Sequence, residues 1–212
     1  MEGRGLTAND TPADLPLLIS AAFCGVVLFS ATIVIVSVPP VTAWWFTPVF
    51  AMPLVVALAF QKRTGWWGVA AFLIGFTLAH CAAAEVADRI YAYDGCAFSH
   101  DPQCSTYALS QRAFPAGFIA GWVGAALSFA MVAMLDARFR TLRTISVMGF
   151  AALVLAGIGA FGFSFGSLPH RQFPFETAFQ LYLPWQTVFA GVLVWLFSGV
   201  GATSPLSPHR AA

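Results

Sequence analysis

Long apolar stretches alternate with short polar or proline-containing segments along the whole chain. Stretches of about 20 apolar residues are typical of membrane-spanning helices, because a helix rises about 1.5 Å per residue and the hydrocarbon core is about 30 Å thick. The pattern predicts spans at residues 15–38, 44–60, 65–88, 115–135, 145–167 and 179–201, with an external loop at 89–114. No stretch keeps the strict apolar–polar alternation of a membrane β-barrel strand. The predicted fold is therefore all-α, a bundle of six transmembrane helices that forms one integral membrane domain over residues 1–212.

The composition supports a lipid environment. Of the 212 residues, 59% are hydrophobic and only 9% are charged, whereas soluble domains carry about 25% charged residues. The formal net charge is +1, and no basic stripe exists that could follow a phosphate backbone, so a nucleic-acid partner is excluded. The expected partners are the lipid bilayer and other membrane subunits.

Basic residues are distributed unevenly between the polar segments on the two sides of the predicted bundle. Seven lie on the side of the N-terminus and three on the opposite side. The seven are Arg4, Lys62, Arg63, Arg138, Arg140, Arg143 and Arg210, and the three are Arg89, Arg112 and Arg171. Because cytoplasmic segments carry the excess of Lys and Arg, both termini are predicted to be cytoplasmic. The strong preference for Arg over Lys and the abundant Ala are typical of a high-GC bacterium, so the expected location is the bacterial inner membrane.

Two cysteines lie in the predicted external loop. Cys96 and Cys104 would face an oxidising compartment, where neighbouring thiols commonly pair. The sequence therefore predicts a disulfide between them, and two free thiols in the loop are the alternative. Cys24 and Cys81 lie within spans and are expected to be small apolar fillers.

Small residues recur at intervals of three and four in several spans, which predicts close helix–helix packing. The fourth span contains Gly117, Gly121 and Gly124, and the fifth contains Ala152, Ala156, Gly159, Gly162 and Gly166. We expect these stripes to pack within one chain rather than between copies.

Polar and aromatic residues at a similar depth suggest a ligand site toward the outer side. A polar group inside a membrane helix is costly, so each one is a functional candidate. We expect His80 of the third span to meet residues of the fourth and sixth spans, near a kink at Pro184. The candidate residues are His80, Glu85, Trp122, Tyr182, Trp185 and Gln186. The alternative is that each faces a different neighbour, and that Glu85 belongs to a charged helix end together with Arg89.

Three functions fit these features. We expect a small-molecule or ion transport or channel component with a polar pocket open to the outside. One alternative is a non-catalytic accessory or assembly subunit of a larger membrane complex. The other is an intramembrane enzyme acting on a lipid or quinone, with His80, Glu85 or Asp88 as acid or base. Catalytic and phosphate-binding motifs are missing from the sequence, which favours a non-enzymatic role. No metal or cofactor is predicted; haem held by His80 and His170 is a minor alternative.

Overall fold

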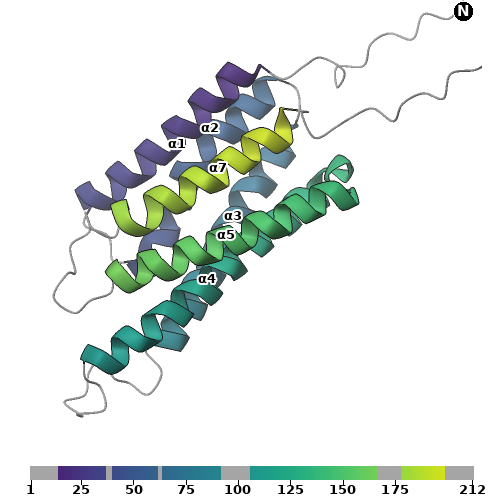
Figure 1. The fold of residues 1–212 in the computed structure, drawn as a ribbon. Helices are drawn as coiled ribbons and strands as arrows, with labels where there is room; N and C mark the ends of the chain where they lie inside the picture. Colours follow the sequence, from purple (N-terminus) through teal and green to yellow (C-terminus); the bar gives the residue numbers. More distant parts are fainter. Residues whose placement is uncertain (1–13, 37–39, 62–63, 92–105, 167–177, 199–212) are drawn as a thin grey trace, which may run out of the picture.

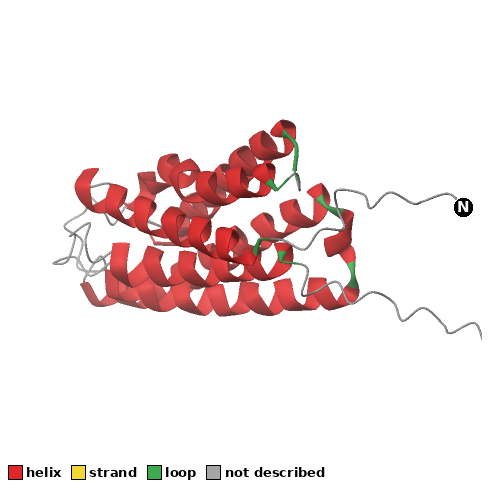
Figure 2. Ribbon diagram, turned by 90° about the horizontal axis from the view of Figure 1, so that it is seen from above, coloured by secondary structure: helices red, strands yellow, loops and turns green. Residues whose placement is uncertain are grey.

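The computed structural model describes residues 14–36, 40–61, 64–91, 106–166 and 178–198. Within these ranges the chain consists of helices joined by short turns, as Figure 2 shows. The elements are α1 (Leu15–Val36), the 3-10 helix η1 (Pro40–Phe46), α2 (Thr47–Phe60), α3 (Trp66–Tyr91), α4 (Thr106–Leu135), the 3-10 helix η4 (Ala137–Arg140), α5 (Leu142–Gly166), the π-helix η5 (Ala178–Tyr182) and α7 (Leu183–Phe197).

Six helical segments in the described part of the chain are long and apolar enough to cross a membrane. They are Leu15–Val36, Ala43–Phe60, Trp66–Ile90, Arg112–Leu135, Leu142–Ser164 and Gln180–Phe197. The predicted all-helical fold with six membrane spans is therefore confirmed, and the protein is a multi-pass membrane protein.

The helix bounds differ from the predicted spans most clearly around the external loop. Helix α4 begins at Thr106 rather than at residue 115, because Pro115 lies inside the helix instead of starting it. Membrane helices tolerate such a proline where neighbouring groups satisfy the freed backbone. Helix α3 continues to Tyr91, so both helices enter the segment predicted as a loop. Cys96 and Cys104 lie outside the described residues.

The helices are arranged as a ring in the order of the sequence. Each helix packs beside the next one along the chain, and α7 closes the ring by packing against both α5 and α1 (Figure 1). Side chains of α3 and α7 meet in the middle of the bundle. Phe72 lies 5.9 Å from Phe197 between ring centroids, Phe76 lies 5.6 Å from Phe189, and His80 lies 5.6 Å from Tyr182. Helices α3 and α7 are therefore antiparallel, and the His80 layer lies toward the end of the bundle where α3 ends.

The opposite end of the bundle carries the arginine-containing turn η4. Phe139 of this turn is buried and packs 5.1 Å from Phe197 between ring centroids. Asp136 accepts a hydrogen bond from the Arg138 backbone N–H at 3.0 Å and binds the Arg138 guanidinium. This side-chain hydrogen bond and the negative charge of Asp136 raise the pKa of Arg138 above its ordinary value. Arg140 donates to the Ala133 carbonyl at 2.8 Å and so satisfies part of the C-terminus of α4.

The predicted close packing at small residues is confirmed between α4 and α5. A Cβ atom built on Gly159 would lie 2.5 Å from the Gly117 carbonyl oxygen, and one on Gly121 would lie 2.9 Å from the Leu155 carbonyl oxygen. Backbones approach this closely only where side chains are missing, as in other membrane helix pairs. These contacts lie within one chain.

Candidate functional site

The candidate site centres on His80, which projects from α3 toward the start of α2. Its Nδ1 atom lies 2.7 Å from the Thr47 hydroxyl oxygen. Thr47 is buried, and its hydroxyl also donates to the Trp44 carbonyl at 2.8 Å. This carbonyl is in reach because η1 leads directly into α2 with Thr47 as the first helical residue and Pro48 after it. The junction of η1 and α2 therefore fixes the position of the imidazole.

Two aromatic rings also lie against the imidazole. Tyr182 meets His80 in an edge-on arrangement at 5.6 Å between centroids, and Phe29 of α1 lies 6.3 Å from His80. Phe29 and Tyr182 also contact each other at 5.3 Å. Helices α1, α2 and α3 and the π-helix η5 thus meet around one histidine, at a single level of the bundle.

A π-helical turn positions Tyr182. The turn η5 ends at Tyr182, two residues before Pro184. Because Pro184 has no N–H, it donates nothing to the Gln180 carbonyl four residues earlier. Gly162 of α5 lies against this widened turn, and a Cβ built on it would be 2.5 Å from the Gln180 carbonyl oxygen. Turns of this kind are frequent at functional sites, and here the turn leaves Tyr182 only 8% exposed.

Two buried polar groups lie near this level without a hydrogen-bond partner. Gln186 is one helical turn after Tyr182 on the same face of α7, it is 4% exposed, and its Oε1 atom is unpartnered. Ser30 follows Phe29 in α1, and its buried hydroxyl is also unpartnered. We call Phe29, Ser30, Thr47, His80, Tyr182 and Gln186 the polar cluster. Unpartnered polar atoms are costly away from water, so these two need an explanation.

An aromatic layer lies directly beneath the polar cluster. The ring of Phe189 contacts Phe76 at 5.6 Å and Phe129 at 5.2 Å between centroids. Phe50 lies 6.2 Å from the same ring, and Trp185 stacks on it at 5.2 Å. The interior below the polar cluster is therefore filled with apolar rings, and the polar side chains lie on one side of this layer.

Sequence reasoning grouped six candidate residues, and the structure brings some of them together. His80, Tyr182 and Gln186 belong to the polar cluster, while Trp185 lies in the aromatic layer below it. Trp122 lies apart, with its side chain 47% exposed on the surface of α4.

The charged candidate Glu85 also lies apart from the polar cluster. Glu85 is exposed and accepts a hydrogen bond from Arg89 at 2.8 Å, which matches a charged helix end. His170, the second residue of the haem alternative, lies outside the described residues. Among the residues that the structure describes, no group of three or more His, Cys, Asp or Glu side chains is arranged to hold a metal ion.

The contribution of α1 was not foreseen from the sequence. Ser30 carries a weak signal, because it is one of few polar residues within the first span. Phe29 carries none, since one phenylalanine among many apolar residues gives no indication of which helix face it occupies. The helix order of the bundle was needed to place Phe29 beside Tyr182, with Ser30 next to Phe29 in α1.

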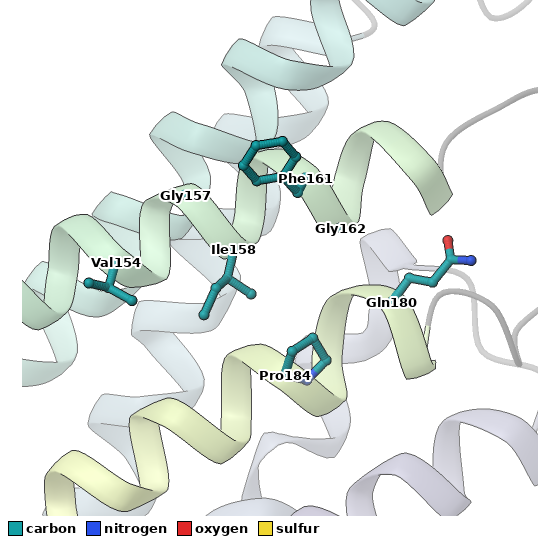
Figure 3. Close-up of a pocket in the computed structure, with 7 residues that line it drawn as sticks. All are labelled: Val154, Gly157, Ile158, Phe161, Gly162, Gln180 and Pro184. Atoms are coloured by element: carbon teal, nitrogen blue, oxygen red, sulfur yellow. The ribbon is translucent and has the colours of Figure 1, made fainter.

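A groove between α5 and α7 is separate from the polar cluster. It has a volume of about 530 Å³ and is lined by Val154, Gly157, Ile158, Phe161, Gly162, Gln180 and Pro184. Figure 3 shows Val154 and Ile158 directed from α5 toward α7, with Gln180 at one end. The lining is almost entirely apolar, and no residue is shared with the polar cluster.

No protein-family model, curated protein or solved structure matches this chain. The fold and the site together define a six-span membrane protein with a buried polar cluster.

Proposed function

We propose that this protein is a small-molecule transport or channel component that binds its solute at the polar cluster. The observation that carries the proposal is the unpartnered Gln186 amide oxygen, 4% exposed, in a helix that is long and apolar enough to span a membrane. An unsatisfied buried polar group costs about 1–3 kcal/mol, and the bilayer core holds no water that could satisfy it. A solute that hydrogen-bonds there would remove that cost.

The arginine distribution supports a binding site that faces outward. The turn η4 and the first turn of α5 carry Arg138, Arg140 and Arg143, and the polar cluster lies toward the opposite end of the bundle. If the arginine end is cytoplasmic, as the positive-inside rule predicts, both termini are cytoplasmic and the polar cluster occupies the outer half of a bacterial inner membrane. The aromatic layer below it would then separate the site from the cytoplasm.

Thiol accessibility tests this proposal. Starting from a chain with Cys24, Cys81, Cys96 and Cys104 replaced by serine, Gln186→Cys is exposed to a membrane-impermeant methanethiosulfonate reagent added from outside. Leu193→Cys is the matched control, because Leu193 follows Phe189 in the same helix and is 1% exposed. We expect labelling of Gln186→Cys and none of Leu193→Cys. An unlabelled Gln186→Cys in a folded protein would overturn the proposal.

One observation favours a second function, that of an accessory subunit of a membrane complex. The rings around Phe189 close the interior of the bundle, and an accessory subunit needs no path through it. Purification in mild detergent separates the two functions. A stoichiometric membrane partner together with an unlabelled Gln186→Cys would favour the accessory role.

A further inference from the structure

The hydrogen atoms of the polar cluster can be assigned from the contacts of Thr47. A threonine hydroxyl has a single hydrogen to donate. The Trp44 carbonyl can only accept, and it lies 2.8 Å from the Thr47 hydroxyl. The hydrogen therefore points to Trp44, because otherwise two lone pairs would face each other at that distance. Thr47 is left to accept from His80 at the 2.7 Å contact.

This assignment fixes the tautomer of His80. If Nδ1 donates to Thr47, a neutral imidazole carries its hydrogen on Nδ1 and keeps a lone pair on Nε2. The imidazole contacts that the structure shows are the Nδ1 hydrogen bond with Thr47 and the ring contacts with Phe29 and Tyr182. Helix α2 thus holds the imidazole so that its free nitrogen can only accept a hydrogen bond.

The unpartnered groups of the polar cluster restrict the chemical class of the ligand further. Gln186 Oε1 is a second acceptor, and the Ser30 hydroxyl can both donate and accept. The six described residues of the polar cluster include no Asp, Glu, Lys or Arg, and Glu85 in the same helix as His80 is exposed and paired with Arg89. Burying an ion without an opposite charge is very costly. The ligand therefore has to be uncharged, to donate to two acceptors and to match a hydroxyl.

We propose that the polar cluster selects a small uncharged polyol, whose hydroxyl groups donate to His80 Nε2 and Gln186 Oε1. The rings of Phe29 and Tyr182 both lie against the imidazole, so the carbon skeleton of such a molecule would meet apolar side chains there. Thr47 is a positioning residue, since it acts on the ligand only through the tautomer of His80. This ligand class rests on the proposed function, because it requires that solutes reach the polar cluster.

Nitrogen NMR of the full-length protein in lipid nanodiscs, with ¹⁵N-labelled histidine, tests the tautomer. His80→Gln identifies the His80 signals by their loss. We expect a protonated Nδ1 and an unprotonated Nε2 in the wild type and in Thr47→Ser, and a mixture of both tautomers in Thr47→Val. A protonated Nε2 in the wild-type protein would overturn the assignment, whether or not any solute binds.

The ligand class is tested with glycerol as the probe. We expect glycerol to shift the Nε2 resonance of the wild-type protein but not that of Gln186→Leu, which lacks the second acceptor. 1,2-Dimethoxyethane, which has no donor, and tetramethylammonium, which is a cation, should not shift it. If Gln186→Cys is labelled but glycerol leaves the wild-type Nε2 resonance unchanged, the polyol is wrong and the proposed function stands. If Gln186→Cys is not labelled at all, the proposed function is wrong, and the ligand class that rests on it is wrong as well.

Discussion

Gly117 of α4 and Gly159 of α5 touch through their backbones, and each fills the space that a side chain on the other would need. A Cβ on Gly159 would lie 2.5 Å from the Gly117 carbonyl oxygen and 3.2 Å from the Gly121 Cα atom. These neighbours are backbone atoms, which cannot swing aside as a flexible side chain can. One contact therefore sets how closely the two helices pack.

The first prediction concerns this contact. Gly159→Ala should destabilise the protein by about 1–3 kcal/mol, because overpacking a tight interface forces the backbones apart. Gly157→Ala is the control, since a Cβ there meets nothing within 4 Å, and alanine is the better helix former. Thermal unfolding in one detergent, followed by size-exclusion chromatography, would compare the two. Equal melting temperatures would show that α4 and α5 are not held by this contact.

The second prediction separates stability from function at Gln186. Leucine has a similar volume and no polar atoms, so Gln186→Leu should remove the cost of an unpartnered buried amide, about 1–3 kcal/mol. The melting temperature should rise, while the glycerol-induced shift of the His80 Nε2 resonance should disappear.

The neighbouring residue Thr187 provides the control for this prediction. Thr187 is exposed, and its hydroxyl donates to the Leu183 carbonyl, so Thr187→Leu should leave both the melting temperature and the glycerol response nearly unchanged. A Gln186→Leu protein that melts at a lower temperature than the wild type would mean that the amide has a partner in the native state.

The membrane fold was predictable because lipid places a simple demand on the sequence. Every backbone polar group must be satisfied within the span, so length and apolar content alone identify the six helices.

The site was predictable only in part. The depth of each residue along its helix placed His80 and Tyr182 at a common level. Depth does not tell toward which neighbouring helix a side chain points. Trp122 has the right depth and faces outward, 47% exposed. Whether a side chain faces the interior or the outer surface of the bundle depends on which helices pack around its own helix.

The third prediction concerns the end of α4. Arg140 donates to the carbonyls of Ala133 and Met134 at 2.8 and 2.9 Å, and these carbonyls have no partner within the helix. Arg140→Ala should lower stability by about 0.5–1 kcal/mol, a small value because exposed charged contacts are screened by solvent. Arg143→Ala removes an equal charge from the exposed start of α5 and should have a smaller effect on thermal unfolding. An equal loss of stability in both variants would show that the net charge matters, rather than the hydrogen bonds of Arg140 to the end of α4.

The last prediction concerns sidedness and the external loop, and it follows from the arginines and cysteines together. A green fluorescent protein fused after Ala212 should fluoresce and an alkaline phosphatase at the same position should be inactive, because the positive-inside rule places this end in the cytoplasm. Cys96 and Cys104 would then lie in the oxidising compartment, where they should pair. Alkylation with N-ethylmaleimide under denaturing conditions should modify them only after reduction. Cys24 and Cys81, which are free thiols, provide the internal control, since they should react without reduction. An active phosphatase at the C-terminus would reverse the orientation, and alkylation of all four cysteines without reduction would exclude the disulfide.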